Sequence, residues 1–197
     1  MVDFMDMEMD MDSTNSTDRR TNSTDRRTEN LLAALVTALG DAQRAASESA
    51  SGQSGATPAA LTYLLQEPGA GLDRIAGPLG LTQSAATRLV DRLERDGKAR
   101  REPGANGRKV SIVLTPEGTR EAEALLELRS GLMSDAMSVL RPHERTVLTG
   151  LLERMLAHLT TDADHGQRIC RMCSLDDCPK RSCPVDIAAV ARTKGPS

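Results

Sequence analysis

The chain has 197 residues and a formal net charge of -3, and only 1% of its residues are aromatic. With so few aromatic side chains, the core has to be built from aliphatic residues and methionine, which favours helices over a β-sandwich. No stretch approaches the about 20 consecutive apolar residues of a membrane span, and no secretory signal is visible. These features predict a cytoplasmic, mainly α protein that does not enter a membrane.

The first 28 residues are polar and repetitive. An alternation of methionine with acidic residues is followed by TNSTDRR, which occurs twice in succession. Because such a segment has little apolar surface to bury, we predict that residues 1–28 form a disordered tail. Residues 29–55 then carry leucine and valine at helical spacing before a polar stretch, which predicts a helix followed by a linker.

Residues 72–115 contain two amphipathic stretches followed by two extended runs. Gly80 suits a left-handed turn between the two stretches, Thr82 is a favourable N-cap for the second, and Asp96-Gly97 ends it. The sequence PGANG between the extended runs includes the Asn-Gly signal of a hairpin. This order is typical of a winged helix-turn-helix, which places its second helix in the major groove of DNA.

The second of these helices has a polar face suited to DNA. Glutamine can hydrogen-bond adenine, arginine can bind guanine or phosphate, and the methyl group of threonine can contact thymine. An arginine in the wing can enter the minor groove. Residues 72–109 include nine basic and five acidic residues, a local net charge of +4. The predicted DNA-binding residues are Gln83, Ser84, Thr87, Arg88 and Arg92 in the helix, with Asn106 and Arg108 in the wing. The alternative is a solvated hairpin with ordinary surface charges.

Residues 116–162 follow the wing and are rich in leucine and methionine at helical spacing, which predicts two further helices. Their apolar faces, together with that of residues 29–55, exceed what one small winged domain can cover. A homodimer is the simplest way to bury the surplus. We therefore predict a DNA-binding domain over residues 56–115, with dimerisation helices on either side of it. The expected fold is mainly α with a small β-wing.

This order of elements, with the stretches LVDRLERDG and LTPEG, resembles the MarR family of bacterial transcriptional regulators over about residues 30–160. The resemblance implies a homodimer that binds pseudo-palindromic double-stranded DNA, and a repressor released by a small-molecule effector or by oxidation. It implies DNA contacts from Gln83, Ser84, Thr87, Arg88 and Arg108, and it implies that the protein is not an enzyme. In the family an Asp often stands two residues before the wing arginine. Because Asn106 occupies that position here, we expect a less rigidly held wing.

All four cysteines lie in residues 163–197, beyond the usual extent of the family, with the spacing C-x2-C-x4-C-x4-C-P. In a reducing compartment such a group indicates a metal before a disulfide. Four thiolates suit either Zn²⁺ or an iron–sulfur cluster, and the compact spacing with a final proline favours a 4Fe–4S cluster. Nearby basic residues should lower the pKa values of the thiols. The predicted ligands are Cys170, Cys173, Cys178 and Cys183.

The main functional hypothesis is a transcriptional repressor whose DNA binding is controlled by this cysteine centre, acting as a redox or metal sensor. One alternative keeps the repressor, gives it a small-molecule effector, and makes the zinc site purely structural. A thiol–disulfide switch is another, and a redox protein with an incidental helix-turn-helix is a third. No pattern of nucleophile and base indicates an enzyme.

Overall fold

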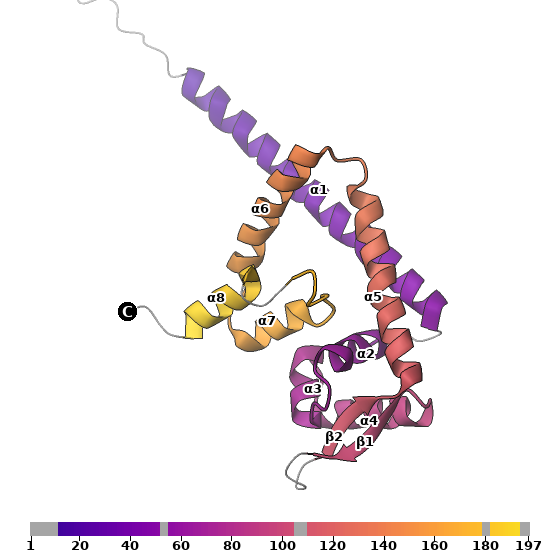
Figure 1. Ribbon diagram of the computed structural model, residues 1–197. Helices are drawn as coiled ribbons and strands as arrows, with labels where there is room; N and C mark the ends of the chain where they lie inside the picture. The colour runs from indigo at the N-terminus through magenta and orange to yellow at the C-terminus, as the bar shows by residue number, and fades with distance from the viewer. Residues whose placement is uncertain (1–11, 52–54, 105–109, 179–181, 194–197) are drawn as a thin grey trace, which may run out of the picture. The chain divides into compact units, whose positions relative to one another are not determined.

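The computed structural model describes residues 12–51, 55–104, 110–178 and 182–193 (Figure 1). These residues form mostly helices, with one two-stranded antiparallel sheet, so the predicted fold class is confirmed. The chain divides into two compact units, residues 1–42 and 43–197. None of the helices in the described ranges is both long enough and apolar enough to cross a membrane.

Helix α1 runs from Asp12 to Ser51. The expected helix after residue 29 is therefore present, but the prediction of disorder differs from the structure over residues 12–28, which are helical. Two physical reasons account for the difference. Extending an existing helix costs much less than starting one, and the hydroxyl of Thr28 donates to the carbonyl of Thr24 at 3.0 Å, which satisfies it within the helix. Residues 1–11 lie outside the described ranges.

The helix-turn-helix is formed by α3 (Leu72–Leu79) and α4 (Gln83–Arg95), preceded by α2 (Thr57–Gln66). Gly80 ends α3 with φ 63° and ψ 32°, the left-handed conformation expected from the sequence. Figure 1 shows α2, α3 and α4 grouped with the strands at one end of α5 (Pro116–Met137).

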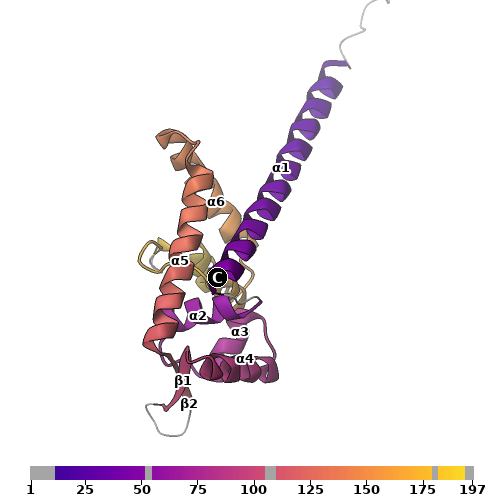
Figure 2. The same ribbon diagram turned by 90° about the vertical axis from the view of Figure 1, so that its right-hand side faces the viewer.

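The wing consists of β1 (Ala99–Pro103) and β2 (Val110–Leu114), paired antiparallel from Ala99 opposite Leu114 to Pro103 opposite Val110. Ile112 also forms an isolated bridge with Ala70, which ties the wing to the segment between α2 and α3. Figure 2 shows the two strands beside α4. The tip of the wing, residues 105–109, is outside the described ranges, and so are the predicted contacts Asn106 and Arg108.

One apolar core joins these elements. Helix α2 packs against α3 and α5, and β2 packs against all three. Helices α2, α3, α4 and α5 and strand β2 each contribute a large, fully buried side chain. These are Leu61, Ile75, Leu93, Leu125 and Ile112, respectively. This core fixes α4 on its inner side and leaves the opposite side of that helix to solvent.

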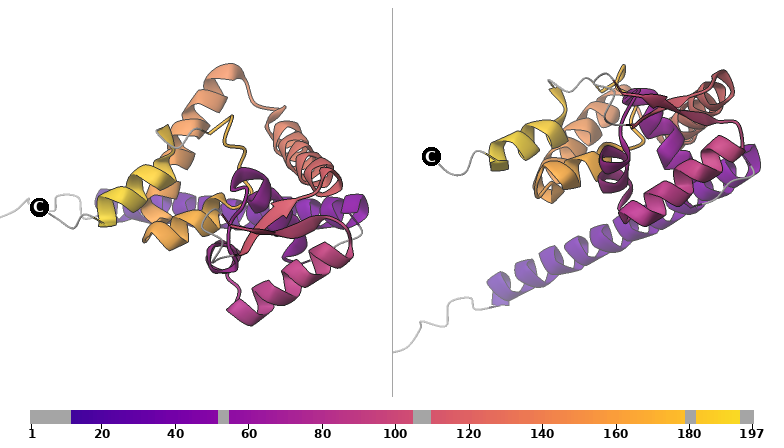
Figure 3. Two further views of the ribbon diagram at one scale, coloured as in Figure 1. Left: turned by 60° about the horizontal axis from the view of Figure 1, so that its bottom comes forward. Right: turned by 90° about the horizontal axis from the view of Figure 1, so that it is seen from below.

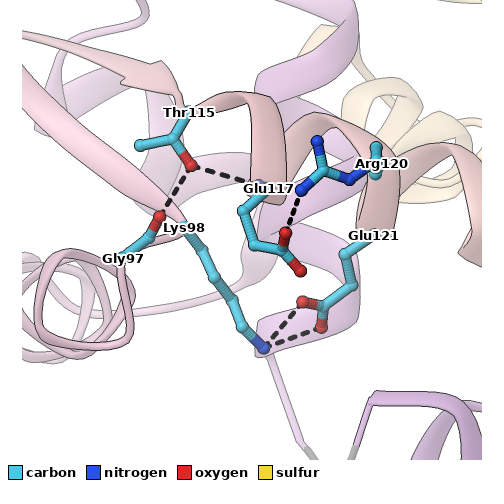
Figure 4. Close-up of polar contacts among 7 residues, drawn as sticks. Gly97, Lys98, Thr115, Glu117, Arg120 and Glu121 are labelled. Carbon is cyan, nitrogen blue, oxygen red and sulfur yellow. Dashed lines mark hydrogen bonds and ion pairs between the residues drawn. The ribbon is translucent and has the colours of Figure 1, made fainter.

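The start of α5 is anchored by polar contacts to Gly97 and Lys98, which join α4 to β1 (Figure 4). The hydroxyl of Thr115 donates to the Gly97 carbonyl at 2.6 Å and accepts the Gly118 amide at 3.2 Å. Lys98 forms a largely buried ion pair with Glu121 at 2.7 Å. A Cβ atom at Gly118 would overlap the carbonyl oxygen of Lys98, so this close crossing requires glycine. Thr115 and Gly118 of the LTPEG motif thus hold the start of α5 against the turn between α4 and β1.

In the described ranges, three α-helices follow α5. They are α6 (Pro142–Leu159), which was expected, α7 (Ala163–Cys170) and α8 (Pro184–Thr193). The separate helix α7 was not predicted. Asp162 caps it by accepting the backbone amide of His165 at 2.8 Å, a local signal that was present in the sequence. Helix α8 packs against both α6 and α7, and α7 packs against α3.

Candidate nucleic-acid interface and cysteine cluster

Helix α4 is held by one apolar face. Ala86, Leu89, Val90 and Leu93 are buried at helical spacing, and the Thr82 hydroxyl accepts the Ala85 amide at 3.2 Å at the helix N-terminus. The predicted N-cap is therefore confirmed. Because the buried face and the cap fix the rotation of the helix, the side chains of its first turns that lie off this face are directed outward.

The outward face carries the predicted helix residues. Gln83, Ser84, Arg88 and Arg92 are exposed and Thr87 is half-buried. Figure 3 shows α4 at the outside of the group formed with α3 and the strands. The Thr87 hydroxyl donates to the Gln83 carbonyl at 2.9 Å. Its hydrogen is thus used within the helix, and the methyl group is the part that can meet a thymine methyl.

The structure separates the cations of this region into two groups. Arg101 in β1 forms ion pairs with Asp91 at 2.7 Å and with Glu94 of α4, and its backbone amide donates to Glu94 at 2.9 Å. The hydrogen bond with Asp91 raises the pKa of Arg101. Among the described residues, no acidic side chain forms an ion pair with Arg88 or with Arg92.

The two groups therefore have different roles. Arg101 is one of the nine basic residues in the local net charge of +4. In the folded chain its ion pairs with Asp91 and Glu94 attach the wing to α4. Arg88 and Arg92 keep their charge available at the surface, which is what binding to a phosphate or to a guanine edge requires.

The four cysteines come together around one cavity. Cys170 ends α7, Cys173 and Cys178 lie in the loop that follows, and Cys183 is buried directly before α8. All four line a cavity of about 280 Å³, whose other walls come from α2, α3, α7 and α8. The thiols are free, with no disulfide between them. The predicted grouping of the cysteines is thus observed, whereas a bound metal or cluster stays a prediction.

Small side chains allow α7 and α8 to approach each other beside this cavity. Gly166 of α7 is buried against α8, and a Cβ atom placed there would lie 3.3 Å from a methyl carbon of Val185. Val185 and Ala189 are the buried residues of α8. The apolar contact between these helices is therefore made by small side chains.

The cysteines differ in their acidity because they interact with one another. A hydrogen bond from Cys170, helped by the positive charge of Arg129, lowers the pKa of Cys173 to about 6. The same hydrogen bond raises the pKa of Cys170. Burial and the neighbouring Cys183 raise the pKa of Cys178 to about 11. Cys173 is therefore the thiol that most readily becomes a thiolate, the form that binds metals.

The charged neighbours of the cluster differ in part from those expected. The sequence pointed to basic residues within the tail, but the cation that lowers the pKa of Cys173 is Arg129 of α5. Lys180 and Arg181 are outside the described ranges. No local pattern marks Arg129, because it is brought to the cluster by the packing of distant segments.

The geometry for a metal is not preassembled. Within the described ranges, no three or more Cys, His, Asp or Glu side chains are arranged to hold a metal ion. The chemistry of the donors fits a thiophilic metal, since four thiols border one cavity and one of them has a lowered pKa. Binding would require the thiols to converge.

Two side chains of α2 contact the cysteine loop and were also missed from the sequence. Gln66 donates through Nε2 to the carbonyl of Cys173. The hydroxyl of the buried residue Thr62 lies 3.2 Å from the carbonyl oxygen of Arg171. Because these pairs are more than 100 positions apart, no spacing pattern in the sequence could have indicated them.

No family model matches the sequence, and no curated protein matches it either. Solved structures do share the fold. A MarR family protein from Bacillus stearothermophilus is 24% identical with a TM-score of 0.63, covering 71% of this chain and 97% of that one. The YusO protein from Bacillus subtilis is 22% identical with a TM-score of 0.61, covering 68% and 95%.

MepR, a transcription regulator of the Staphylococcus aureus multidrug efflux pump MepA, is 24% identical with a TM-score of 0.57, covering 66% of this chain and 96% of that chain. These likenesses show a MarR-like winged helix fold. The shared fold spans nearly the whole of each of these structures but leaves about a third of this chain unmatched.

Proposed function

We propose that this protein is a sequence-specific DNA-binding transcription regulator of the MarR type that acts as a repressor. The observation that carries the proposal is the outward face of α4, where Gln83, Ser84, Arg88 and Arg92 are exposed on a helix fixed by a buried opposite face. The fold shared with solved transcription regulators supports it.

In this proposal α4 enters the major groove. Gln83 hydrogen-bonds an adenine edge, the Thr87 methyl group contacts thymine, and Arg88 binds a guanine edge or a phosphate. Arg92, one turn later, binds the phosphate backbone and adds salt-dependent affinity. Arg108, supported by Asn106, reaches the minor groove from the wing.

We further propose that the regulator is a homodimer. Helix α6, every residue of which is described, buries none of its side chains, and Val147, Leu151 and Leu159 are 61%, 47% and 56% exposed. Helix α1 exposes Leu35 and Val36 in the same way. Contiguous apolar faces of this kind mark protein interfaces. A two-fold dimer would present two α4 helices to the two halves of a pseudo-palindromic operator.

The cysteine cluster would make DNA binding responsive to a signal. Four thiols around one cavity suit Zn²⁺ or an iron–sulfur cluster. Of these we favour 4Fe–4S, because the ligand spacing is compact and a proline follows the last cysteine. Cys170, Cys173, Cys178 and Cys183 would be the ligands. The alternatives are a thiol–disulfide switch, and a repressor that responds to a small-molecule effector and has a structural zinc site.

The DNA-binding proposal is tested by replacing Arg88. An operator would first be selected from random double-stranded DNA with the wild-type chain. Arg88→Ala should weaken binding to that operator by about 10- to 100-fold and reduce its salt dependence. Arg120→Ala on α5, where the arginine pairs with Glu117, is the matched control and should bind as the wild type does. Equal binding by both variants would exclude α4 as the reading helix.

A further inference from the structure

The loop that carries the cysteines is attached to the DNA-binding region through its backbone. Gln66, the last residue of α2, donates to the Cys173 carbonyl. Thr62, one turn earlier and fully buried, places its hydroxyl 3.2 Å from the Arg171 carbonyl and 3.1 Å from the Pro58 carbonyl of its own helix. The loop therefore shares the single hydroxyl hydrogen of Thr62 with α2, and the contact made by Gln66 is the stronger of the two. These two contacts lie on one side of α2 and are made to backbone carbonyls two residues apart in the loop. They therefore depend on the conformation of the loop backbone.

That conformation depends on the first pair of cysteines. The amide of Cys173 donates to the carbonyl of Cys170 at 2.9 Å, which closes the C-x2-C turn. When both thiols bind a common partner, the turn is fixed. When they are released, the turn and the two carbonyls that face α2 are free to move. Leaving a part-buried carbonyl without its hydrogen bond is unfavourable. A movement of the loop would therefore either shift α2 or break its contacts with Cys173 and Arg171.

Helix α2 in turn supports the helix-turn-helix. It packs against α3, α5 and β2, and Leu61 and Leu64 are buried in the common core. At its C-terminal end Glu67 pairs with Arg74 of α3 at 3.0 Å. A displacement of α2 would therefore be passed directly to α3, on which α4 packs.

The cavity beside the cysteines borders the same corner. Tyr63 and Glu67 of α2 and Arg74 of α3 line it together with the four thiols. A group bound by the cysteines would thus lie in the same cavity as side chains of α2 and α3. One side of the cavity and the support of α4 are therefore made of the same two helices, α2 and α3.

We propose that Gln66 and Thr62 are positioning residues that couple the cysteine loop to the helix-turn-helix. They transmit the state of the loop to α2 through the carbonyls of Cys173 and Arg171, and α2 passes it to α3 and α4. This inference rests on the proposed regulation of DNA binding by the cysteine centre. It adds the route, which runs within a single subunit.

The test uses three variants of the full chain. Gln66→Met keeps the length of the side chain but removes the donor, and Thr62→Val keeps the volume but removes the hydroxyl. The matched control is Thr146→Val, because the hydroxyl of Thr146 is exposed and donates to the Pro142 carbonyl of its own helix. Each protein is purified without air, and its metal and iron–sulfur content is measured by elemental analysis and visible absorption.

The readout is the ratio of operator affinities before and after removal of the metal by a chelator. We expect this ratio to differ from one in the wild type and in Thr146→Val, and to fall to within about twofold of one in Gln66→Met, with a smaller reduction in Thr62→Val. Metal content and circular dichroism should match the wild type in all three variants. Hydrogen exchange in α3 and α4 should respond to the chelator in the wild type and not in Gln66→Met.

Two outcomes distinguish the coupling role of Gln66 and Thr62 from the proposed regulation of DNA binding by the cysteine centre. If the wild type responds to the chelator and both α2 variants respond equally, the coupling role is wrong while the proposed regulation stands. If operator affinity in the wild type does not change, the regulation fails and the coupling fails with it. Loss of metal binding in Gln66→Met would also overturn the proposal, because Gln66 would then be needed to build the site rather than to transmit its state.

Discussion

The winged helix and the cysteine tail are folded by different means. In the winged helix, large aliphatic side chains from several elements are completely buried, among them Ile75, Leu93 and Ile112. In the tail, residues 163–193, the buried side chains are small, and four thiols line a cavity instead of filling it. The first region is stabilised by its own apolar core, whereas α7 and α8 of the second pack on each other, on α3 and on α6.

This difference fits the two roles proposed above, in which the winged helix reads DNA and the cysteine tail responds to a signal. A region that reads DNA needs a fixed geometry, which a well-packed core provides. A region that responds to a signal needs two states of similar free energy, and local stability is low where few apolar contacts are buried. Changes aimed at each region separately can therefore test whether they differ as proposed.

The largest effect is expected in the core of the winged helix. Leu93 is fully buried, and Leu93→Ala should reduce the free energy of unfolding by about 2–5 kcal/mol, through lost apolar contact and the cavity that remains. Chemical denaturation followed by circular dichroism measures the change. Val139 is 82% exposed, so Val139→Ala should stay within about 0.5 kcal/mol of the wild type. Similar losses in both variants would contradict a core centred on α4.

Removing the metal should affect the other region. If the cysteines hold a metal that is about 100-fold above its dissociation constant, its loss lowers the local stability by about 2.7 kcal/mol. A chelator should therefore raise amide hydrogen exchange in α7 and α8 by about 100-fold and change that of Ile112 in the core much less. An unchanged tail would mean that α7 and α8 are folded without a metal. Changes of equal size in both regions would remove the contrast between them.

The smallest effect is expected at the cap of α7. The hydrogen bond from the His165 amide lowers the pKa of Asp162. A carboxyl whose pKa is lowered on folding stabilises the folded state above its unfolded pKa, about 3.9, and that contribution is lost as the pH falls through the lower, folded pKa. The His165 amide chemical shift should therefore titrate below about pH 3.9.

The comparison variant is Asp162→Asn, which keeps a capping oxygen but does not ionise. In this variant the titration of the His165 amide should disappear, whereas Asp164→Asn, in the first turn of the same helix, should leave it in place. A titration at the ordinary pKa of an aspartate in the wild type would show that the cap does not hold in solution.

Much of the winged helix could be predicted because its signals are local. The cap at Thr82, the left-handed Gly80 and the alternating strand β2 each depend on residues a few positions apart. The local signals were also incomplete. The start of α1 at Asp12 was missed because the polar repeat has low intrinsic helix propensity, and α7 was missed although Asp162 marks its beginning.

The sequence by itself determined the order of the elements in the winged helix, the polar face of α4 and the presence of four closely spaced cysteines. Only the tertiary structure decided that Arg101 is used to fasten the wing, that Arg129 is the cation beside Cys173, and that Gln66 contacts the cysteine loop. Capping and helical spacing arise from neighbours along the chain, whereas these contacts join distant segments and form only when the whole core is packed.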